Sequence, residues 1–270
     1  MTNSRHELPT WTDIDASVPH IARVYDYWLG GKDNFEVDRK LGDRTIEAYP
    51  GIVRSVQTNR AFLARAVRFF ADELGVRQFL DIGTGIPTAN NTHEVAQSID
   101  PWCRIVYVDS DPIVLRHAEA LLKSTPEGAC AYIDGDMHDT SGILAEAART
   151  LDFGQPVAVM LISILHFVDT LDQTRAIVNK LLDPMPPGSG FAVSHPASDL
   201  DADQMAEMIR RINMVLPEKT TLRSRAEVER IFDGYELVPP GVVRAADWRP
   251  APDAATGVPC GVWAGIAVKR

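Results

Sequence analysis

Short apolar runs alternate with helical patterns from Gln78 to the C-terminal end of the sequence. Runs of about four to eight apolar residues, bounded by glycine or aspartate, are typical of strands buried on both faces. Five such strands are expected, over residues 79–82, 105–108, 129–133, 156–162 and 190–194. The alternation predicts an α/β fold in which helices cover a mostly parallel sheet.

Two further apolar runs, at 235–238 and 262–268, lie near the C-terminal end. We expect them to form the last two strands, paired antiparallel at the edge of the sheet. A short helix should precede them, because Ser224 and Glu227 have the spacing of a capping box.

Helical patterns, without strand patterns, fill the first third of the chain. Apolar residues recur every three or four positions from Val18 to Leu29, which predicts a helix capped by Ser17 and closed by Gly30 and Gly31. Two more helices are expected, over residues 38–48 and 53–74, and the second should carry three arginines outward, namely Arg60, Arg65 and Arg68.

This change of pattern predicts two parts. Residues 1–75 are expected to form a helical cap, and residues 76–270 an α/β core. Because amphipathic helices cannot bury their apolar faces alone, the cap should pack onto the core.

Composition excludes several classes of protein. Of the 270 residues, 45% are hydrophobic and 24% charged, as in ordinary globular proteins. The net charge of −10 and the lack of a dense Lys/Arg cluster exclude nucleic acid as an expected partner. No run approaches the roughly 18 apolar residues that span a membrane. Three scattered cysteines indicate neither disulfides nor a metal site, so a reducing cytoplasm is expected, and no signal indicates an oligomeric state.

A glycine loop, Asp81-Ile-Gly-Thr-Gly85, directly follows the first expected core strand. Glycines at the carboxyl end of a strand let a ligand approach the backbone closely. Dinucleotide-binding folds carry a third glycine, whereas this chain continues with Ile86. The departure disfavours an NAD-binding oxidoreductase and leaves room for a smaller adenosine-bearing ligand. Asn91 and Glu94 are spaced as a capping box for the next helix.

Carboxylates end the next two strands. Asp109 can accept hydrogen bonds from both hydroxyls of a ribose, while Asp111 is expected to cap the following helix. Asp136 can accept from the amine of an adenine that Met137 covers. The alternative is that these acids only cap helices or form turns. Because ligands of such sheets bind at this edge, the order of the three motifs favours an adenosine-bearing ligand.

This combination resembles the class I S-adenosylmethionine-dependent methyltransferases over residues 78–270. A narrower resemblance spans nearly the whole chain. It is to an actinobacterial methyltransferase family once catalogued as a domain of unknown function. It rests on five strings: VPHIARVYDYWLGGKDNF, NRAFLARAVRF, DIGTGIPTANNTHEVAQ, VYVDSDPIVLRHAEALL and SRAEVERIFDGYELVPPGVV. The resemblance implies a Rossmann-like fold, S-adenosyl-L-methionine as cofactor, and methyl transfer to an acceptor that it does not identify.

The same resemblance implies positions for the cofactor. Its methionine part would lie near Asp81, Gly83, Thr84 and Gly85. Its ribose would lie on Asp109 with Ser110, and its adenine on Asp136 and Met137. The segment from Ser163 to His166 would line the sulfonium and the acceptor.

A hydroxyl or protonated amine acceptor would need a base. His166 and His195 each come just after a strand and are candidates, with a purely structural role as the alternative. No Asn/Asp-Pro-Pro-Tyr motif for planar nitrogen acceptors occurs, so a small-molecule O- or N-acceptor is expected. A sensor that binds S-adenosylmethionine without methylating stays open as the second function.

The stretch HIARVYDYWLGGKDNF contains a Gly-Gly-Lys that invites a phosphate-binding interpretation. A phosphate loop needs a preceding strand and a Ser or Thr after the lysine, whereas here a helix precedes and Asp33 follows. We expect the segment to fold over the sheet edge as a lid. The side chains expected to wall the acceptor pocket are His20, Arg23, Tyr25, Tyr27, Lys32 and Asn34.

Overall fold

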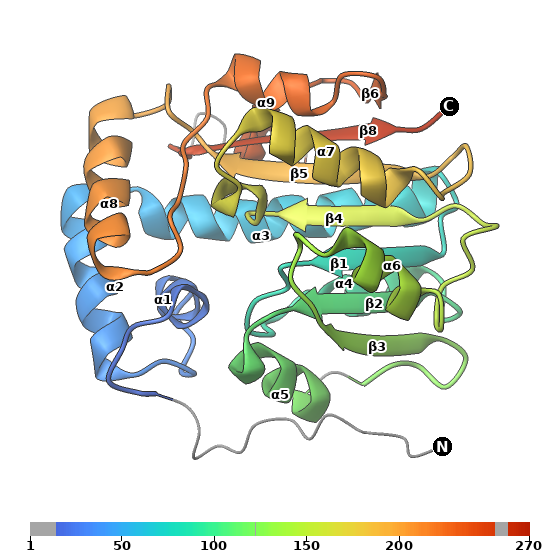
Figure 1. Ribbon diagram of the computed structural model, residues 1–270, viewed down its shortest axis with the longest axis horizontal. Helices are drawn as coiled ribbons and strands as arrows, with labels where there is room; N and C mark the ends of the chain where they lie inside the picture. The colour runs from blue at the N-terminus through green and yellow to red at the C-terminus, as the bar shows by residue number, and fades with distance from the viewer. Residues whose placement is uncertain (1–14, 122, 252–258) are drawn as a thin grey trace.

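The computed structural model describes residues 15–121, 123–251 and 259–270 (Figure 1). Its centre is a sheet of eight strands within these residues, in the order β3-β2-β1-β4-β5-β8-β6, with β7 paired to β8. The strands are β1 Gln78–Ile82, β2 Arg104–Asp109, β3 Ala129–Asp134, β4 Ala158–Ile162, β5 Gly190–Pro196, β6 Glu236–Leu237, β7 Val243–Arg244 and β8 Val262–Val268.

Strands β1 to β5 are parallel to one another, and β8 runs antiparallel to β5, β6 and β7. The predicted mostly parallel sheet with an antiparallel C-terminal edge is therefore confirmed. The register of β2 and β3 pairs Asp109 with Asp134, so the carboxyl ends of neighbouring strands lie level. This alignment brings the loops after β1, β2 and β3 together.

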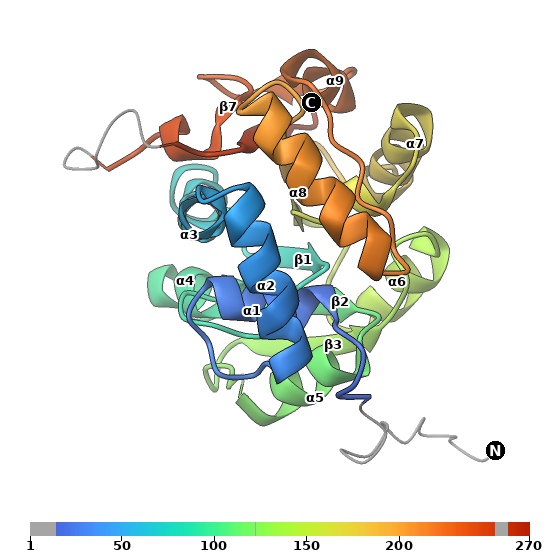
Figure 2. The same ribbon diagram turned by 90° about the vertical axis from the view of Figure 1, so that its left-hand side faces the viewer.

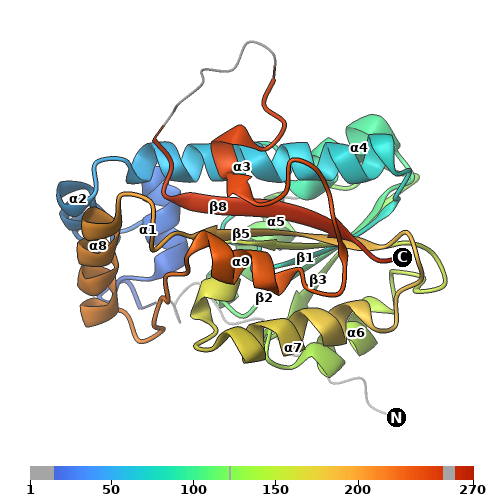
Figure 3. The same cartoon turned by 90° about the horizontal axis from the view of Figure 1, so that it is seen from above.

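Helices cover both faces of the sheet and one of its ends. Figure 3 shows α3 and α4 over one face and α6, α7 and α9 over the other. In Figures 1 and 2, α1, α2 and α8 stand beyond the carboxyl ends of the parallel strands. The helices are α1 Ile21–Trp28, α2 Glu36–Ala48, α3 Ile52–Arg68, α4 Thr92–Ile99, α5 Pro112–Leu121, α6 Thr140–Ala147, α7 Leu171–Leu182, α8 Ala202–Val215 and α9 Arg225–Ile231.

Each face of the sheet has its own apolar core. Phe79 of β1 packs in one cluster with Phe62 and Phe70, and its neighbour Leu80 packs in the other with Val178. The alternation follows from the strand geometry, since successive side chains point to opposite faces. Helix α3, which lies within the predicted cap, therefore packs on the sheet. The division of the chain at residue 75 stays a prediction.

A third apolar cluster joins the helices beyond the sheet end. Trp28 of α1, Leu41 of α2 and Met208 of α8 are members, and all three are buried. Helix α8 has no counterpart among the predicted helices. Its buried residues lie at positions typical of one helical face, namely Met205, Met208, Ile209 and Ile212.

The observed helix starts agree with one predicted N-cap and differ from another. Asn91 caps α4 with Glu94 in a capping box, as predicted. The predicted start at Ser17 is wrong, since α1 begins at Ile21 and its N-cap is His20. Pro19 explains the difference, because the residue before a proline is disfavoured in helical conformation.

The described residues contain neither a membrane-spanning helix nor a cluster of metal ligands. No helix there combines the length and the apolar character that crossing a membrane requires. Nor does any group of three or more His, Cys, Asp or Glu side chains in those ranges have an arrangement suited to a metal ion.

Candidate functional site

A cavity of about 700 Å³ lies between the carboxyl ends of β1 to β4 and the helices α1, α3 and α8. One half is lined by the loops that follow the strands, and the other half, here called the helical compartment, by the three helices. The nine residues predicted to bind the cofactor and one predicted base line the cavity: Asp81, Gly83, Thr84, Gly85, Asp109, Ser110, Asp136, Met137, Ser163 and His166.

The glycine loop has the conformation that only glycine adopts easily. Gly83 has a φ of 74° and Gly85 a φ of 66°. A Cβ atom on Gly83 would lie 2.5 Å from the side chain of Ile164, whereas one on Gly85 would meet nothing within 4 Å. Gly83 is therefore required for close packing of the loop, and Gly85 faces open space where a ligand can approach.

Asp109 is held by the backbone on both sides. Its Oδ2 accepts from Gly85 N at 2.9 Å, and its Oδ1 accepts from Asp111 N at 3.0 Å. Each carboxylate oxygen has two lone pairs, so each retains the capacity to accept from a ligand hydroxyl. Asp111 Oδ1 accepts from Ile113 N at 2.8 Å, so Asp111 caps α5 as predicted.

Asp81 is a buried carboxylate at the bottom of the loop. Its Oδ2 accepts from the Thr92 hydroxyl at 2.6 Å. Burial raises the pKa of Asp81 to about 6, because the Thr92 hydrogen bond and the charge of Arg60 only partly offset the loss of solvation. A positive group of a ligand beside Asp81 would favour its ionised form.

The prediction that Arg60 points outward from α3 is wrong. Arg60 lines the cavity, and its guanidinium donates to Ala89 O at 3.2 Å and to Asn91 Oδ1 at 3.3 Å. Arg65 also turns inward and donates to Trp248 O at 2.8 Å. Both arginines are half-buried because they satisfy carbonyls of loops that cross α3, a contact that periodicity does not reveal.

Carboxylates dominate the charge of the cavity wall. Two permanently cationic side chains, Arg60 and Lys219, line it. The carboxylates that line it are Asp26, Asp81, Asp109, Asp111, Asp136, Asp169 and Glu218. This excess favours a cationic ligand and disfavours an anionic one.

The adenine end of the predicted site is more open. Asp136 accepts from His138 N at 2.9 Å and pairs with the His138 ring at 2.8 Å. Met137 beside it is buried, and both residues line the cavity.

The two candidate histidines have different surroundings. His166 lines the cavity, and its burial, with the nearby charge of Arg223, lowers its pKa to about 3. His195 is fully buried and does not belong to the cavity lining. Its Nδ1 bonds Pro196 O at 2.9 Å and its Nε2 bonds Arg223 at 2.5 Å. Both ring nitrogens of His195 are therefore engaged in the core.

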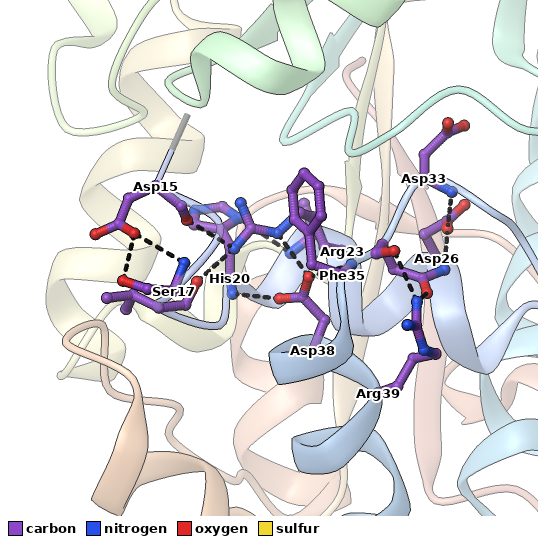
Figure 4. A network of polar contacts seen from close by, with 12 residues as sticks. Asp15, Ser17, His20, Arg23, Asp26, Asp33, Phe35, Asp38 and Arg39 are labelled. Carbon is purple, nitrogen blue, oxygen red and sulfur yellow. Dashed lines mark hydrogen bonds and ion pairs between the residues drawn. The ribbon is translucent and has the colours of Figure 1, made fainter. Parts of the chain in front are cut away.

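Helix α1 divides the predicted lid residues into two sets. His20 and Tyr25 line the cavity, whereas the other four do not: Arg23, Tyr27, Lys32 and Asn34. Figure 4 shows Arg23 turned toward Asp38 of α2, with 2.8 Å between Arg23 Nε and Asp38 Oδ2. Residues three or four positions apart share a helix face, so the face of Tyr25 and the face of Arg23 differ.

Two of the remaining lid candidates bond to side chains of α2 and α1. Tyr27 donates to Asp43 at 2.6 Å, and Asn34 donates to Asp26 at 2.8 Å. Lys32 is exposed. The glycine pair ends α1, as predicted, since Gly30 N donates to Tyr27 O at 2.9 Å.

His20 links α1 to the loop after β2. Its Nδ1 lies 2.9 Å from Asp111 Oδ2 and 3.3 Å from Ala22 N. One ring nitrogen carries either a proton or a lone pair, so it donates to Asp111 when protonated and accepts from Ala22 when bare. Burial lowers the pKa of His20, but the hydrogen bond and charge of Asp111 outweigh it and the net pKa is raised.

Asn59 is a lining residue that the sequence did not reveal. Its Nδ2 donates to the Tyr25 hydroxyl at 2.9 Å and to the Ser163 hydroxyl at 3.0 Å. Tyr25, Asn59 and Ser163 form what we call the Asn59 cluster. Asn59 is a buried polar residue in an apolar helical pattern, and that contrast is the only signal for it in the sequence.

Residues 8–270 match the sequence profile of a family described as S-adenosyl methyltransferase. The chain belongs to this family. The methyltransferase is 42% identical to a DUF574 family protein from Streptomyces avermitilis, with a TM-score of 0.91 over 95% of this chain and 99% of that one. It is 41% identical to a candidate methyltransferase from Thermobifida fusca, with a TM-score of 0.86 over 97% and 100% of the two chains.

A more distant structure supports the fold alone. The plantazolicin methyltransferase BpumL is 12% identical, with a TM-score of 0.53 over 92% of this methyltransferase and 95% of BpumL. No protein of curated function matches the chain. The predicted actinobacterial family, the class I methyltransferase fold and S-adenosylmethionine as cofactor are confirmed by these matches, which also favour a methyltransferase over the oxidoreductase alternative.

Proposed function

We propose that this methyltransferase transfers a methyl group from S-adenosylmethionine to a hydroxyl or amine of a small molecule. One observation carries the proposal: a single cavity joins the loops that would hold the cofactor to the helical compartment. Helices α1 and α8 stand over this cavity, and this enclosure suits a small acceptor better than a macromolecule (Figure 2).

The residues present fit the cofactor by charge and by space. Asp81 would hold the amino group of the methionine part, since its buried carboxylate gains from a cation beside it. Asp109 and Ser110 would bind the ribose, and Asp136 with Met137 the adenine. Arg60 is our candidate for the carboxylate of the cofactor, because it lines the cavity and its charge acts on Asp81 at the glycine loop.

When bound, S-adenosylmethionine supplies a methyl group whose bond to sulfur breaks as the bond to the acceptor forms, leaving a neutral thioether. The protein then has to align the acceptor and exclude water. Helix α1 serves as the lid in this proposal, with His20 and Tyr25 facing the cavity. These two side chains keep the predicted lid role, whereas Arg23, Tyr27 and Asn34 hold α1 in place.

His166 is the candidate to receive a proton or to orient the acceptor. With a pKa of about 3, its ring is neutral at pH 7 and accepts a hydrogen bond. It would hold a transferred proton only briefly and pass it to water. His195 has no such role in this proposal, because its ring bonds Arg223 and Pro196.

The proposed compartment is the cytoplasm. All three cysteines are free, and two of them are buried, which suits a reducing environment.

The test separates binding from turnover. Calorimetry should show binding of S-adenosylmethionine and S-adenosylhomocysteine but not of NAD. A cell extract is then split by ultrafiltration, and release of S-adenosylhomocysteine is measured with the small-molecule filtrate and with the macromolecular fraction. Release with the filtrate, abolished in Asp109→Ala, is the expected result. Release only with the macromolecules would refute a small acceptor, and binding without any release would favour the sensor.

A further inference from the structure

The helical compartment has one wall that is wholly apolar. Met205, Met208, Ile209 and Ile212 of α8 line the cavity, and no polar residue of α8 does. Trp28 of α1 adds to the same lining. Methionine side chains are flexible and polarizable, so such a wall accommodates apolar bodies of irregular shape. An occupant of this compartment therefore gains by burying apolar surface.

A polar feature interrupts this apolar lining where α1 and α3 meet the segment after β4. It is the Asn59 cluster, in which Asn59 Nδ2 donates to the hydroxyls of Tyr25 and Ser163. Asn59 is 2% exposed, and its Oδ1 is buried without a hydrogen-bond partner. A buried carbonyl oxygen without a donor costs free energy that a ligand O–H or N–H would recover.

The cluster lies next to the glycine loop. Ser163 belongs to it and is followed by Ile164, the residue that packs against Gly83. Ser163 has a φ of 53°, which a serine rarely adopts, so the surrounding contacts hold it in this position. A ligand group bonded to Asn59 would therefore sit between the cofactor half and the apolar wall.

Several charged groups of the lining already bond within the protein. Arg60 and Lys219 donate to backbone carbonyls, and Asp26 accepts from Asn34 and Asp33. The excess of carboxylates around the whole cavity also disfavours an anion. Arg60, the candidate partner of the cofactor's carboxylate, and Lys219 are the two permanently cationic side chains of the lining, so an anionic acceptor would meet little counter-charge there.

We propose that the helical compartment binds a mainly apolar acceptor without negative charge, whose hydroxyl or N–H group donates to Asn59 while its body lies against Met205, Met208 and Ile212. This inference rests on the proposed function, since it names the acceptor class for the same site. Asn59 is thereby a specificity-determining residue for the acceptor.

Three naphthalene compounds serve as probes, measured by calorimetry with S-adenosylhomocysteine at saturation so that the cofactor half is filled. 2-Naphthol carries a donor, 2-methoxynaphthalene lacks one, and 2-naphthoate is anionic. We expect 2-naphthol to bind most tightly and 2-naphthoate to bind at least about tenfold more weakly, because the anion meets carboxylates and little counter-charge. Equal binding of 2-naphthoate and 2-naphthol would overturn the proposal.

Substitution of Asn59 tests the polar contact. Asn59→Leu keeps the size of the side chain and removes the amide. It should weaken 2-naphthol binding about tenfold, while the affinity for 2-methoxynaphthalene changes by less than about twofold. An equal loss for both probes would assign Asn59 a merely structural role and refute its part in specificity.

Two tryptophan variants of α8 test the location. Met208→Trp fills the compartment and should abolish 2-naphthol binding. Met214→Trp is the matched control, because Met214 is 73% exposed on the other side of the same helix. S-adenosylhomocysteine binding reports whether each variant is folded. Retained 2-naphthol binding in a folded Met208→Trp would refute the compartment as its site.

The two proposals fail in different ways. Wild-type protein that does not bind S-adenosylhomocysteine would refute the proposed function. Protein that binds S-adenosylhomocysteine but none of the three probes would refute only the acceptor class.

Discussion

Individual carboxylates around the cavity have distinct tasks despite their similar positions after strands. Asp109 is bonded to Gly85 and retains lone pairs toward the cavity, whereas Asp111 caps a helix and pairs with His20. Asp81 is deeply buried and keeps a raised pKa. The backbone around each carboxylate, more than its position in the sequence, decides which of these tasks it performs.

Replacing Asp109 by alanine should weaken S-adenosylmethionine binding by about ten- to a hundredfold. The reason is the loss of charge-assisted hydrogen bonds to the ribose, worth roughly 1.5–3 kcal/mol. Calorimetry of the purified variant measures the effect. Asp134→Ala is the matched control, because Asp134 ends the neighbouring strand but lies outside the cavity lining. Equal affinity of Asp109→Ala and wild type would remove Asp109 from the site.

The His20–Asp111 contact should hold α1 most firmly in mildly acidic solution. The raised pKa of His20 means that its contribution is complete below its ordinary value of 6.5 and is lost as the pH rises through the folded value. Burial acts to raise the pKa of Asp111, but the hydrogen bond and charge of His20 outweigh burial and the net pKa is lowered. The contribution of Asp111 to stability is therefore lost only as the pH falls below 3.8. Arg23 and Glu218 also act on His20, with opposite signs.

Hydrogen exchange of the α1 amides measures this effect, after correction for the intrinsic pH dependence of exchange. Protection should be higher at pH 5.5 than at pH 8 in the wild type and should differ little in His20→Gln. The same pH dependence in both proteins would contradict the role of the contact.

At the scale of elements, the helices beyond the sheet end depend on one another. Helix α2 packs against α1 on one side and α8 on the other. A buried ion pair between Arg23 and Asp38 fixes α1 to α2, and Asp38 Oδ1 also accepts from His20 N at 2.9 Å. The position of His20 on the cavity therefore depends on contacts made on the opposite face of α1.

Replacing Arg23 by methionine should lower the free energy of unfolding by about 3 kcal/mol. Arg23 is 3% exposed and Asp38 is fully buried, so the substitution leaves an uncompensated carboxylate in the interior. Urea denaturation measures the loss. Arg39→Met provides the comparison, because Arg39 is exposed and bonds Asn34, and its substitution should cost less than about 0.5 kcal/mol. Similar stabilities of the two variants would show that the buried pair does not hold α1.

At the scale of the whole molecule, the cavity is built from both ends of the chain. Helices α1 and α3 come before the sheet, and α8 and the start of β8 come after its parallel strands, yet all of them line one cavity (Figure 1). A ligand that fills the cavity therefore bridges elements that are distant in sequence and should stabilise the fold as a unit.

Cofactor binding should raise the melting temperature. A ligand at about a hundred times its Kd adds roughly 2.7 kcal/mol to the free energy of unfolding, which in a chain of this size corresponds to about 5–10 °C. Differential scanning fluorimetry with S-adenosylmethionine, S-adenosylhomocysteine and NAD measures it. The first two should shift the transition and NAD should not. A shift with NAD alone would favour a dinucleotide site.

The sequence by itself determined the local features. Runs of apolar residues defined the strands, Asn91 and Ser224 marked helix starts, and Gly83 and Gly85 marked a loop that a ligand can approach. Such features depend on backbone preferences and on the period of side chains along one element. The family resemblance added the cofactor, because its long strings extend over nearly the whole chain.

Only the tertiary structure decided what each face meets. Periodicity shows that Arg60 and Asn59 lie on α3, but not that loops and Tyr25 reach them there. It does not distinguish His166, which lines the cavity, from His195, whose ring is engaged by Arg223. Helix α8 supplies the apolar wall although it lies far along the chain from α1 and from the glycine loop. These outcomes depend on contacts between distant parts of the chain, and no local pattern encodes which parts come together.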